Sequence, residues 1–270
     1  MYPNLFKIGP LEIHSYGLML AVSFLLGILF AMYRAKKQNV DPNKIMDLSV
    51  VIVISAILGA RFLYVIFHLE EFRGHWLDVI NPFQSNGQIG IAGLTMLGGF
   101  IAALFFGLLY MKMNKLPMLK ISDIISPSLG LGIFVTRIGC FLNGCCYGTP
   151  TNVSWGMIFP PESAAGYHFT NIPIHPAQLY SSAYGLLIFL VLLFVERWKK
   201  FDGFLLYSFL ILYGISRFTV DIFRYYEESM VLFTIGNTPI SLNQGISLLM
   251  ILGGITLIIY NLFKQKKVTE

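Results

Sequence analysis

The sequence predicts an all-α integral membrane protein that crosses a membrane seven times. Its 270 residues are 56% hydrophobic and only 12% charged, whereas a soluble domain carries about 25% charged residues. Seven apolar runs approach the roughly 20 residues that a helix needs to cross a bilayer. We expect transmembrane helices at 14–33, 47–67, 89–111, 121–142, 177–195, 203–223 and 242–263. They form a single polytopic membrane domain over 1–270.

The basic residues predict the orientation of these helices. Thirteen of the 19 lysines and arginines lie in four short segments, at 34–44, 112–120, 196–200 and 264–267. Cytoplasmic loops are enriched in Lys and Arg, so we expect the N-terminus outside and the C-terminus in the cytoplasm. The net charge of +5 is thereby explained by topology, and no nucleic-acid partner is expected. The first run lacks the charged region and cleavage site of a secretory signal, so we expect it to stay in the membrane.

The longer loops lie on the outer side, at 68–88, 143–176 and 224–241, and are expected to form a small cap there. They carry several aromatic residues, which fit an interface belt: Trp76, Tyr147, Trp155, Tyr167, Tyr225 and Tyr226. Ser241 followed by Gln244 matches a capping box that opens the last helix.

Three arginines inside apolar runs mark the candidate site. Arg61, Arg137 and Arg217 each lie in the outer half of a different run, where a charge costs about 2.5–3.5 kcal/mol on insertion scales. Three cations at one level favour an anionic ligand such as a lipid phosphate, which arginine binds in a bidentate manner. The alternatives are snorkelling to head groups or pairing with a carboxylate, for which Asp221 is available to Arg217.

The polar residues around these arginines follow helical spacing. Tyr213, Arg217 and Asp221 are four residues apart and are expected on one helix face. His14 and Tyr16 open the first run at the same level.

The segment TRIGCFLNGCCYG (136–148) contains all three cysteines. The spacing of Cys140, Cys145 and Cys146 matches no zinc motif, so no metal is expected. A disulfide from Cys140 to either partner, a reactive thiol and simple packing all remain open. His175 is expected to cap or hydrogen-bond rather than transfer protons. No Gly-rich nucleotide loop is present, so no cofactor is expected.

Six motifs occur in a fixed order along the chain: IGPLEIHSYGLM (8–19), LGARFLYVIF (58–67), TRIGCFLNGCCYG (136–148), HPAQLY (175–180), LYGISRFTVDIFR (212–224) and SLNQ (241–244). Together they resemble the bacterial prolipoprotein diacylglyceryl transferase family over nearly the whole chain. The resemblance implies a multi-pass protein of the bacterial cytoplasmic (inner) membrane, with the outer cap on the periplasmic side. It implies transfer of a diacylglyceryl group from phosphatidylglycerol to the lipobox cysteine of a preprolipoprotein signal peptide, the first step of lipoprotein maturation. A thioether forms and glycerol phosphate leaves.

The resemblance also implies residue roles. Arg137 would hold the phosphatidylglycerol head group, and Arg217 would stabilise charge on the departing phosphate. Tyr16 and Tyr213 would orient substrate. Our own hypothesis, independent of the resemblance, is that His14 or His175 assists thiol ionisation. The substrate-binding set that the resemblance implies is Arg61, Gly98, Gly99, Arg137, Gly139, Asn143, Gly144, Gly148, His175, Asp221 and Arg224.

The chain departs from the family pattern at four positions. Thr136, Cys140 and Cys145 stand where the family has Gly, Asn and Glu, and Leu97 stands where many members have His. That glutamate and histidine are the groups expected to deprotonate or position the thiol. Two other functions therefore stay open: a lipid-dependent transferase with another acceptor, and a non-enzymatic lipid-binding membrane protein or transporter.

Overall fold

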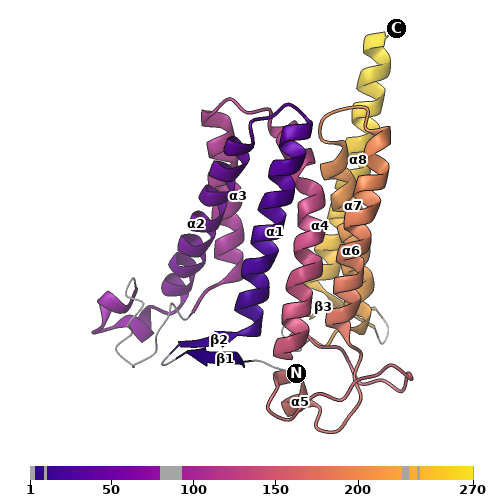
Figure 1. Cartoon of the computed structure of the whole chain (residues 1–270). Coiled ribbons are helices and arrows are strands. Elements are labelled where there is room, and N and C mark those ends of the chain that lie inside the picture. The colour runs from indigo at the N-terminus through magenta and orange to yellow at the C-terminus, as the bar shows by residue number, and fades with distance from the viewer. Residues whose placement is uncertain (1–3, 9–10, 80–92, 227–230, 236–237, 270) are drawn as a thin grey trace. The chain divides into compact units, whose positions relative to one another are not determined.

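The computed structural model describes residues 4–8, 11–79, 93–226, 231–235 and 238–269. Within these ranges, seven helices are long and apolar enough to cross a membrane, which confirms the seven predicted helices. They are α1 (Ser15–Lys37), α2 (Pro42–Phe67), α3 (Met96–Met113), α4 (Met118–Asn143), α6 (Ala177–Val195), α7 (Phe204–Phe223) and α8 (Leu242–Thr269), all labelled in Figure 1.

Short elements join these helices. Two antiparallel hairpins, which the all-α prediction omitted, precede α1 and α8: β1 (Asn4–Ile8) with β2 (Leu11–His14), and β3 (Val231–Ile235) with β4 (Thr238–Ser241). The remaining pieces are 3₁₀ helices η1 (Leu69–Phe72), η2 (Trp76–Val79) and η3 (Glu196–Trp198), and the one-turn helix α5 (Ala164–His168). Strands of four or five residues are too short to stand out as an alternating pattern.

Two helix starts differ from the prediction by five residues or more. The helix α2 begins at Pro42, five residues before the expected position, because Asp41 caps it: the Asn43 N–H donates to Asp41 Oδ1 at 2.9 Å, and proline is favoured in a first turn. The helix α3 begins at Met96, because Gly93 has φ +76° and the following two residues are not helical. The expected start at 89 lies outside the described residues.

The chain divides into two compact units, one made of Met1–Ala31 with Ser122–Glu270 and the other of Met32–Ile121. The single domain and the shared cap stay predictions. In the second unit α2 packs along α3 (Figure 1). A Cβ at Gly98 would collide with the carbonyl oxygen of Gly59, and one at Gly99 would lie 3.0 Å from the carbonyl oxygen of Ala56. Small residues therefore let these two helices approach closely.

In the first unit, α7 packs between α6 and α8. Ile188 and Leu192 of α6 are buried against Leu205 and Phe209 of α7. The start of α7 is held by Asp123 from α4. Its buried carboxylate accepts from the N–H groups of Gly203 (2.8 Å) and Leu206 (3.0 Å).

Lys199 completes this anchor, with Nζ 2.9 Å from the same carboxylate. A carboxylate at a helix N-terminus satisfies free N–H groups and matches the helix dipole. One acidic side chain of α4 thus sets the position from which α7 carries Arg217.

Candidate active site

The helix α7 presents Tyr213, Arg217 and Asp221 on one face, as their spacing predicted. Arg217 Nη2 lies 3.3 Å from Asp221 Oδ1, and the Asp221 carboxylate is buried. Asp221 therefore neutralises Arg217, which confirms the pairing that was left open. Tyr213, one turn earlier, lines the same cavity as Arg217.

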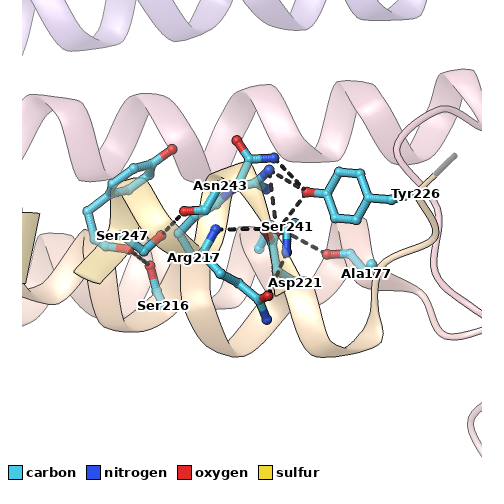
Figure 2. Close-up of polar contacts among 11 residues, drawn as sticks. Ala177, Ser216, Arg217, Asp221, Tyr226, Ser241, Asn243 and Ser247 are labelled. Carbon is cyan, nitrogen blue, oxygen red and sulfur yellow. Dashed lines mark hydrogen bonds and ion pairs between the residues drawn. The ribbon is translucent and has the colours of Figure 1, made fainter. Parts of the chain in front are cut away.

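Tyr226 ties this pair to the start of α8 (Figure 2). Its hydroxyl accepts from Arg217 Nη2 at 2.6 Å and from Asn243 Nδ2 at 3.1 Å, and it donates to Asp221 Oδ1 at 2.7 Å. Burial raises the pKa of Tyr226 against the charge of Arg217, and the Asp221 acceptor raises it further. The hydroxyl thus stays protonated and can act as donor. Arg217 is held in one orientation before any substrate arrives.

Ser241 connects the same network to the helix that follows. Its N–H donates to Gln244 Oε1 at 3.0 Å, and the Gln244 N–H donates to Ser241 Oγ at 3.1 Å, so the predicted capping box is confirmed. The Ser241 hydroxyl also donates to Asp221 Oδ2 at 2.9 Å. Both oxygens of the Asp221 carboxylate are therefore satisfied (Figure 2).

Arg137 of α4 and Arg217 of α7 line one cavity. Its other lining residues are Ile133, Ser181, Tyr184, Tyr213, Ser216 and Val220. The space enclosed is about 20 Å³, which holds about one water molecule. The cavity is therefore a small niche lined by residues of α4, α6 and α7. Two cations from different helices suit an anion that bridges them.

The chain leaves α4 through a Schellman turn. Gly144 has φ +73°. Its N–H donates to the Phe141 carbonyl at 3.2 Å, and the Cys145 N–H donates to the Cys140 carbonyl at 3.2 Å. This is the pattern in which a glycine in the left-handed region ends a helix. Gly144 and the preceding Asn143, both predicted site residues, thus set where α4 ends and turn the chain back on itself.

This turn brings the three cysteines together. The Sγ atoms of Cys140, Cys145 and Cys146 all lie within 4.8 Å of one another, and the three are free thiols. Arg137 donates a hydrogen bond to the Cys146 sulfur. The Cys145 thiol donates to the Cys140 carbonyl at 3.8 Å. The neighbouring thiols of Cys140 and Cys145 lower the pKa of Cys146, and the charges of Arg224 and Arg137 lower it further. Sequence spacing did not predict this cluster.

Gly148 joins three segments beside the cluster. Its N–H donates to the His175 carbonyl at 3.1 Å, and the N–H of Thr149 donates to the Phe223 carbonyl at 2.9 Å. A Cβ at Gly148 would collide with the His175 carbonyl oxygen and lie 2.6 Å from that of Phe223. Glycine is required at this predicted site position because the start of α6 and the end of α7 meet there.

His175 lies at the start of α6 as a hydrogen-bonding residue. Its Nδ1 is 3.1 Å from the Tyr180 hydroxyl, and its ring packs against Phe223 at 5.0 Å between centroids. Burial lowers the pKa of His175, so the ring is neutral at pH 7.

Two buried polar atoms near the thiols have no hydrogen-bond partner among the described residues: Arg224 Nε and Gln178 Oε1. The other end of Gln178 donates to the Cys145 carbonyl at 2.8 Å. The Arg224 guanidinium lies 5.0 Å from the centroid of the Tyr226 ring. Unpaired buried polar atoms are rare in proteins, so these two call for a partner such as water or a ligand.

Tyr16 approaches the site from α1. A Cβ at Gly139 would lie 2.8 Å from Met19 Cβ and 3.4 Å from Tyr16 Cα, so this glycine lets α1 pack tightly on α4. The Tyr16 side chain is 39% exposed. His14, the last residue of β2, is exposed.

The other three predicted site residues lie in the second unit. Arg61 Nε donates to the Val79 carbonyl at 2.9 Å and Nη1 to the Gly93 carbonyl at 3.3 Å. Backbone carbonyl oxygens therefore accept hydrogen bonds from this buried cation. Gly98 and Gly99 pack α3 against α2. A phosphate shared by Arg61 with Arg137 and Arg217 stays a prediction.

Sequence reasoning missed four contributors: Tyr226, Asn243, Gln178 and Cys146. Tyr226 was assigned to the interface belt with the other loop aromatics. Asn243 and Gln178 lie inside the SLNQ and HPAQLY motifs, so motif membership was the available signal.

Comparison with known proteins supports the resemblance. The family model for prolipoprotein diacylglyceryl transferase matches residues 3–260. The phosphatidylglycerol–prolipoprotein diacylglyceryl transferase of Clostridium tetani is 31% identical over 99% of this chain and 100% of the relative. That of Campylobacter hominis is 32% identical over 93% of this chain and 88% of the relative. The chain belongs to the prolipoprotein diacylglyceryl transferase family.

Proposed function

We propose that this protein transfers a diacylglyceryl group from phosphatidylglycerol to the lipobox cysteine thiol of a preprolipoprotein, the first step of lipoprotein maturation. Family membership supports the reaction class. The observation that carries the proposal to named residues is that Arg137 and Arg217 line one cavity. The test below also distinguishes two alternatives: transfer from phosphatidylglycerol to a different acceptor, and lipid binding without transfer.

The reaction displaces a phosphate ester at carbon. The thiolate sulfur attacks the carbon of the diacylglyceryl group that is bonded to the phosphate oxygen. The bond between this carbon and that oxygen breaks, and glycerol phosphate leaves with the electron pair. A displacement of this kind is accelerated by an ionised nucleophile and by cations fixed on the leaving group. The pair of arginines supplies the second requirement.

The two arginines have different surroundings, which suggests different roles. Arg217 is held by Asp221 and Tyr226 at 3.3 and 2.6 Å, so it is preorganised for charge that develops on the departing phosphate. Arg137 donates to the Cys146 sulfur and would hold the head group. Tyr213 lines the same cavity and, with Tyr16 of α1, would orient the substrate.

A histidine would assist ionisation of the acceptor thiol. His175 is neutral because burial lowers its pKa, and its Nδ1 is engaged by the Tyr180 hydroxyl. In the tautomer in which Nδ1–H donates to the Tyr180 hydroxyl, Nε2 is the proton-accepting atom. His14 is the alternative, at the exposed end of β2.

The chain would lie in the bacterial cytoplasmic (inner) membrane with its N-terminus outside. The basic loops support this orientation. It places the ends of α4 and α7, and with them the site, towards the periplasm, where a secreted preprolipoprotein presents its lipobox. Its partners would be phosphatidylglycerol and the signal peptide, with no nucleic acid.

Transfer is tested with purified protein in phosphatidylglycerol micelles and a lipobox peptide with one cysteine. The expected result is a peptide mass gain of one diacylglyceryl group, absent from a Cys→Ser peptide. Arg137→Ala should lose transfer, while Arg197→Ala, an exposed arginine next to α6, should keep it. Wild-type transfer by Arg137→Ala, or bound lipid without product, would contradict the proposal.

A further inference from the structure

The three thiols next to Arg137 have the arrangement of a metal site. Cys140 lies in the last turn of α4 and is 4% exposed, and Cys145 and Cys146 follow the Schellman turn at Gly144. Their Sγ atoms lie within 4.8 Å of one another. They are the only cysteines of the chain. Three soft ligands at one point select a thiophilic cation.

The distances suit zinc after small side-chain rotations. A Zn–S bond of about 2.3 Å in tetrahedral geometry separates two sulfurs by about 3.8 Å. The sulfurs lie within 4.8 Å of one another and therefore need to approach by at most about 1 Å. Three protein ligands with an open fourth position are the arrangement of catalytic rather than structural zinc.

Charge and support around the cluster agree with this ion. Three thiolates and Zn²⁺ carry a net charge of −1, and the guanidinium charges of Arg137 and Arg224 both act on Cys146. The Asn143 side chain hydrogen-bonds to the Cys145 sulfur, and Gln178 holds the Cys145 carbonyl at 2.8 Å. Partners of this kind orient metal ligands and tune their basicity.

The backbone at the cluster is also unusual. Cys146 has φ +59°, a left-handed conformation that costs a non-glycine residue of order 1–3 kcal/mol and is concentrated at functional sites. This conformation aims a second consecutive cysteine at the helix end.

We propose that Cys140, Cys145 and Cys146 bind one zinc ion and that the acceptor thiol of the peptide takes the fourth position, the second part resting on the proposed function. The bound thiol releases its proton to solvent as it becomes a zinc thiolate. Its sulfur then forms the carbon–sulfur bond while the carbon–oxygen bond breaks, and the electron pair leaves on glycerol phosphate. The thioether product is a weaker ligand and departs. Zinc keeps its oxidation state throughout.

The zinc site would account for two of the departures from the family pattern. The positions expected to hold a glutamate and a histidine for thiol deprotonation are Cys145 and Leu97 here. A metal-bound thiol needs no such base, because coordination itself deprotonates it.

Metal binding is tested on the reduced, full-length protein in detergent without lipid or peptide. Cd²⁺ is the probe, because thiolate coordination gives an ultraviolet charge-transfer band. The expected result is saturation at one Cd²⁺ per chain, with at least tenfold weaker binding in Cys140→Ser, Cys145→Ser and Cys146→Ser. The matched control His75→Ala, outside the cluster, keeps the band. Three titratable thiols without a band would overturn the proposal.

The fourth position is tested with Co²⁺-loaded protein, whose visible spectrum reports ligand exchange. The lipobox peptide should change the spectrum and its Cys→Ser form should not. An unchanged spectrum would overturn the thiol-binding part. Turnover is not needed for this readout, so a changed spectrum without any diacylglyceryl transfer would refute the proposed function and leave the zinc site standing. Removal of zinc by a chelator should abolish transfer and added Zn²⁺ restore it; full transfer by metal-free protein would overturn the catalytic role.

Discussion

Tyr226→Phe removes one hydroxyl from the centre of the arginine network. That hydroxyl accepts from Arg217 and Asn243 and donates to Asp221. After the change, Arg217 retains its 3.3 Å contact with Asp221. Ser241 still donates to the Asp221 carboxylate. The fold should survive, and Arg217 should lose its fixed orientation.

The magnitude follows from the charged partners. A hydrogen bond to a charged group contributes about 1.5–3 kcal/mol, and the loss falls on the transition state if Arg217 stabilises the leaving group. A loss of about 2 kcal/mol lowers kcat about 30-fold. We expect KM for phosphatidylglycerol to change little, because Arg137 is untouched.

The assay is peptide transfer with kcat and KM determined separately. Tyr225→Phe is the matched control, since it removes the adjacent hydroxyl while its ring stays stacked on Tyr147 at 5.8 Å. A Tyr226→Phe protein with wild-type kcat, or with raised KM alone, would refute the role given to Arg217.

Three further predictions concern stability in detergent. Gly148→Ala should lower the melting temperature by the equivalent of about 1–3 kcal/mol, because its Cβ meets two backbone carbonyl oxygens, whereas Gly253→Ala, with nothing within 4 Å, should not; equal melting curves would contradict this. Asp123→Ala should cost about 3 kcal/mol, since the N-terminus of α7 loses its cap and Lys199 its buried partner, and unchanged thermal unfolding would count against it. Because burial lowers the pKa of His175, the unfolded state binds more protons below about pH 6.5, so stability should fall as pH drops through that value. The variant His175→Gln should flatten this part of the profile of melting temperature against pH, and an unaltered slope would show that another group is responsible.

Local features were predictable because they depend on short stretches of chain. Helix length is set by bilayer thickness, so hydropathy located all seven helices. Residues four apart on a helix share a face, which predicted the pairing of Arg217 with Asp221. The capping box at Ser241 and Gln244 likewise needs only a four-residue pattern. In each case the contact lies within about one turn, where helix geometry leaves little freedom.

Contacts between segments were not predictable in the same way. Tyr226 was expected in the interface belt with the other loop aromatics. Its hydroxyl instead bonds residues of α7 and α8, because the end of α7 meets the start of α8. Gly98 and Gly99 were expected at substrate, and their space is taken by the approach of α2. Such outcomes depend on which helix faces pack together, and a single sequence does not reveal helix rotation.

The cysteines show where this boundary falls. Sequence alone determined that Cys140 ends an apolar helix and that a glycine follows before Cys145 and Cys146. The spacing of the cysteines indicated no metal, because it matches no known zinc motif. Only the tertiary structure decided that the three sulfurs converge beside Arg137. The physical reason is that two residues with left-handed backbone, Gly144 and Cys146, turn the chain at the end of α4. Backbone hydrogen bonds to His175 and Phe223, at the start of α6 and the end of α7, then hold the segment that follows.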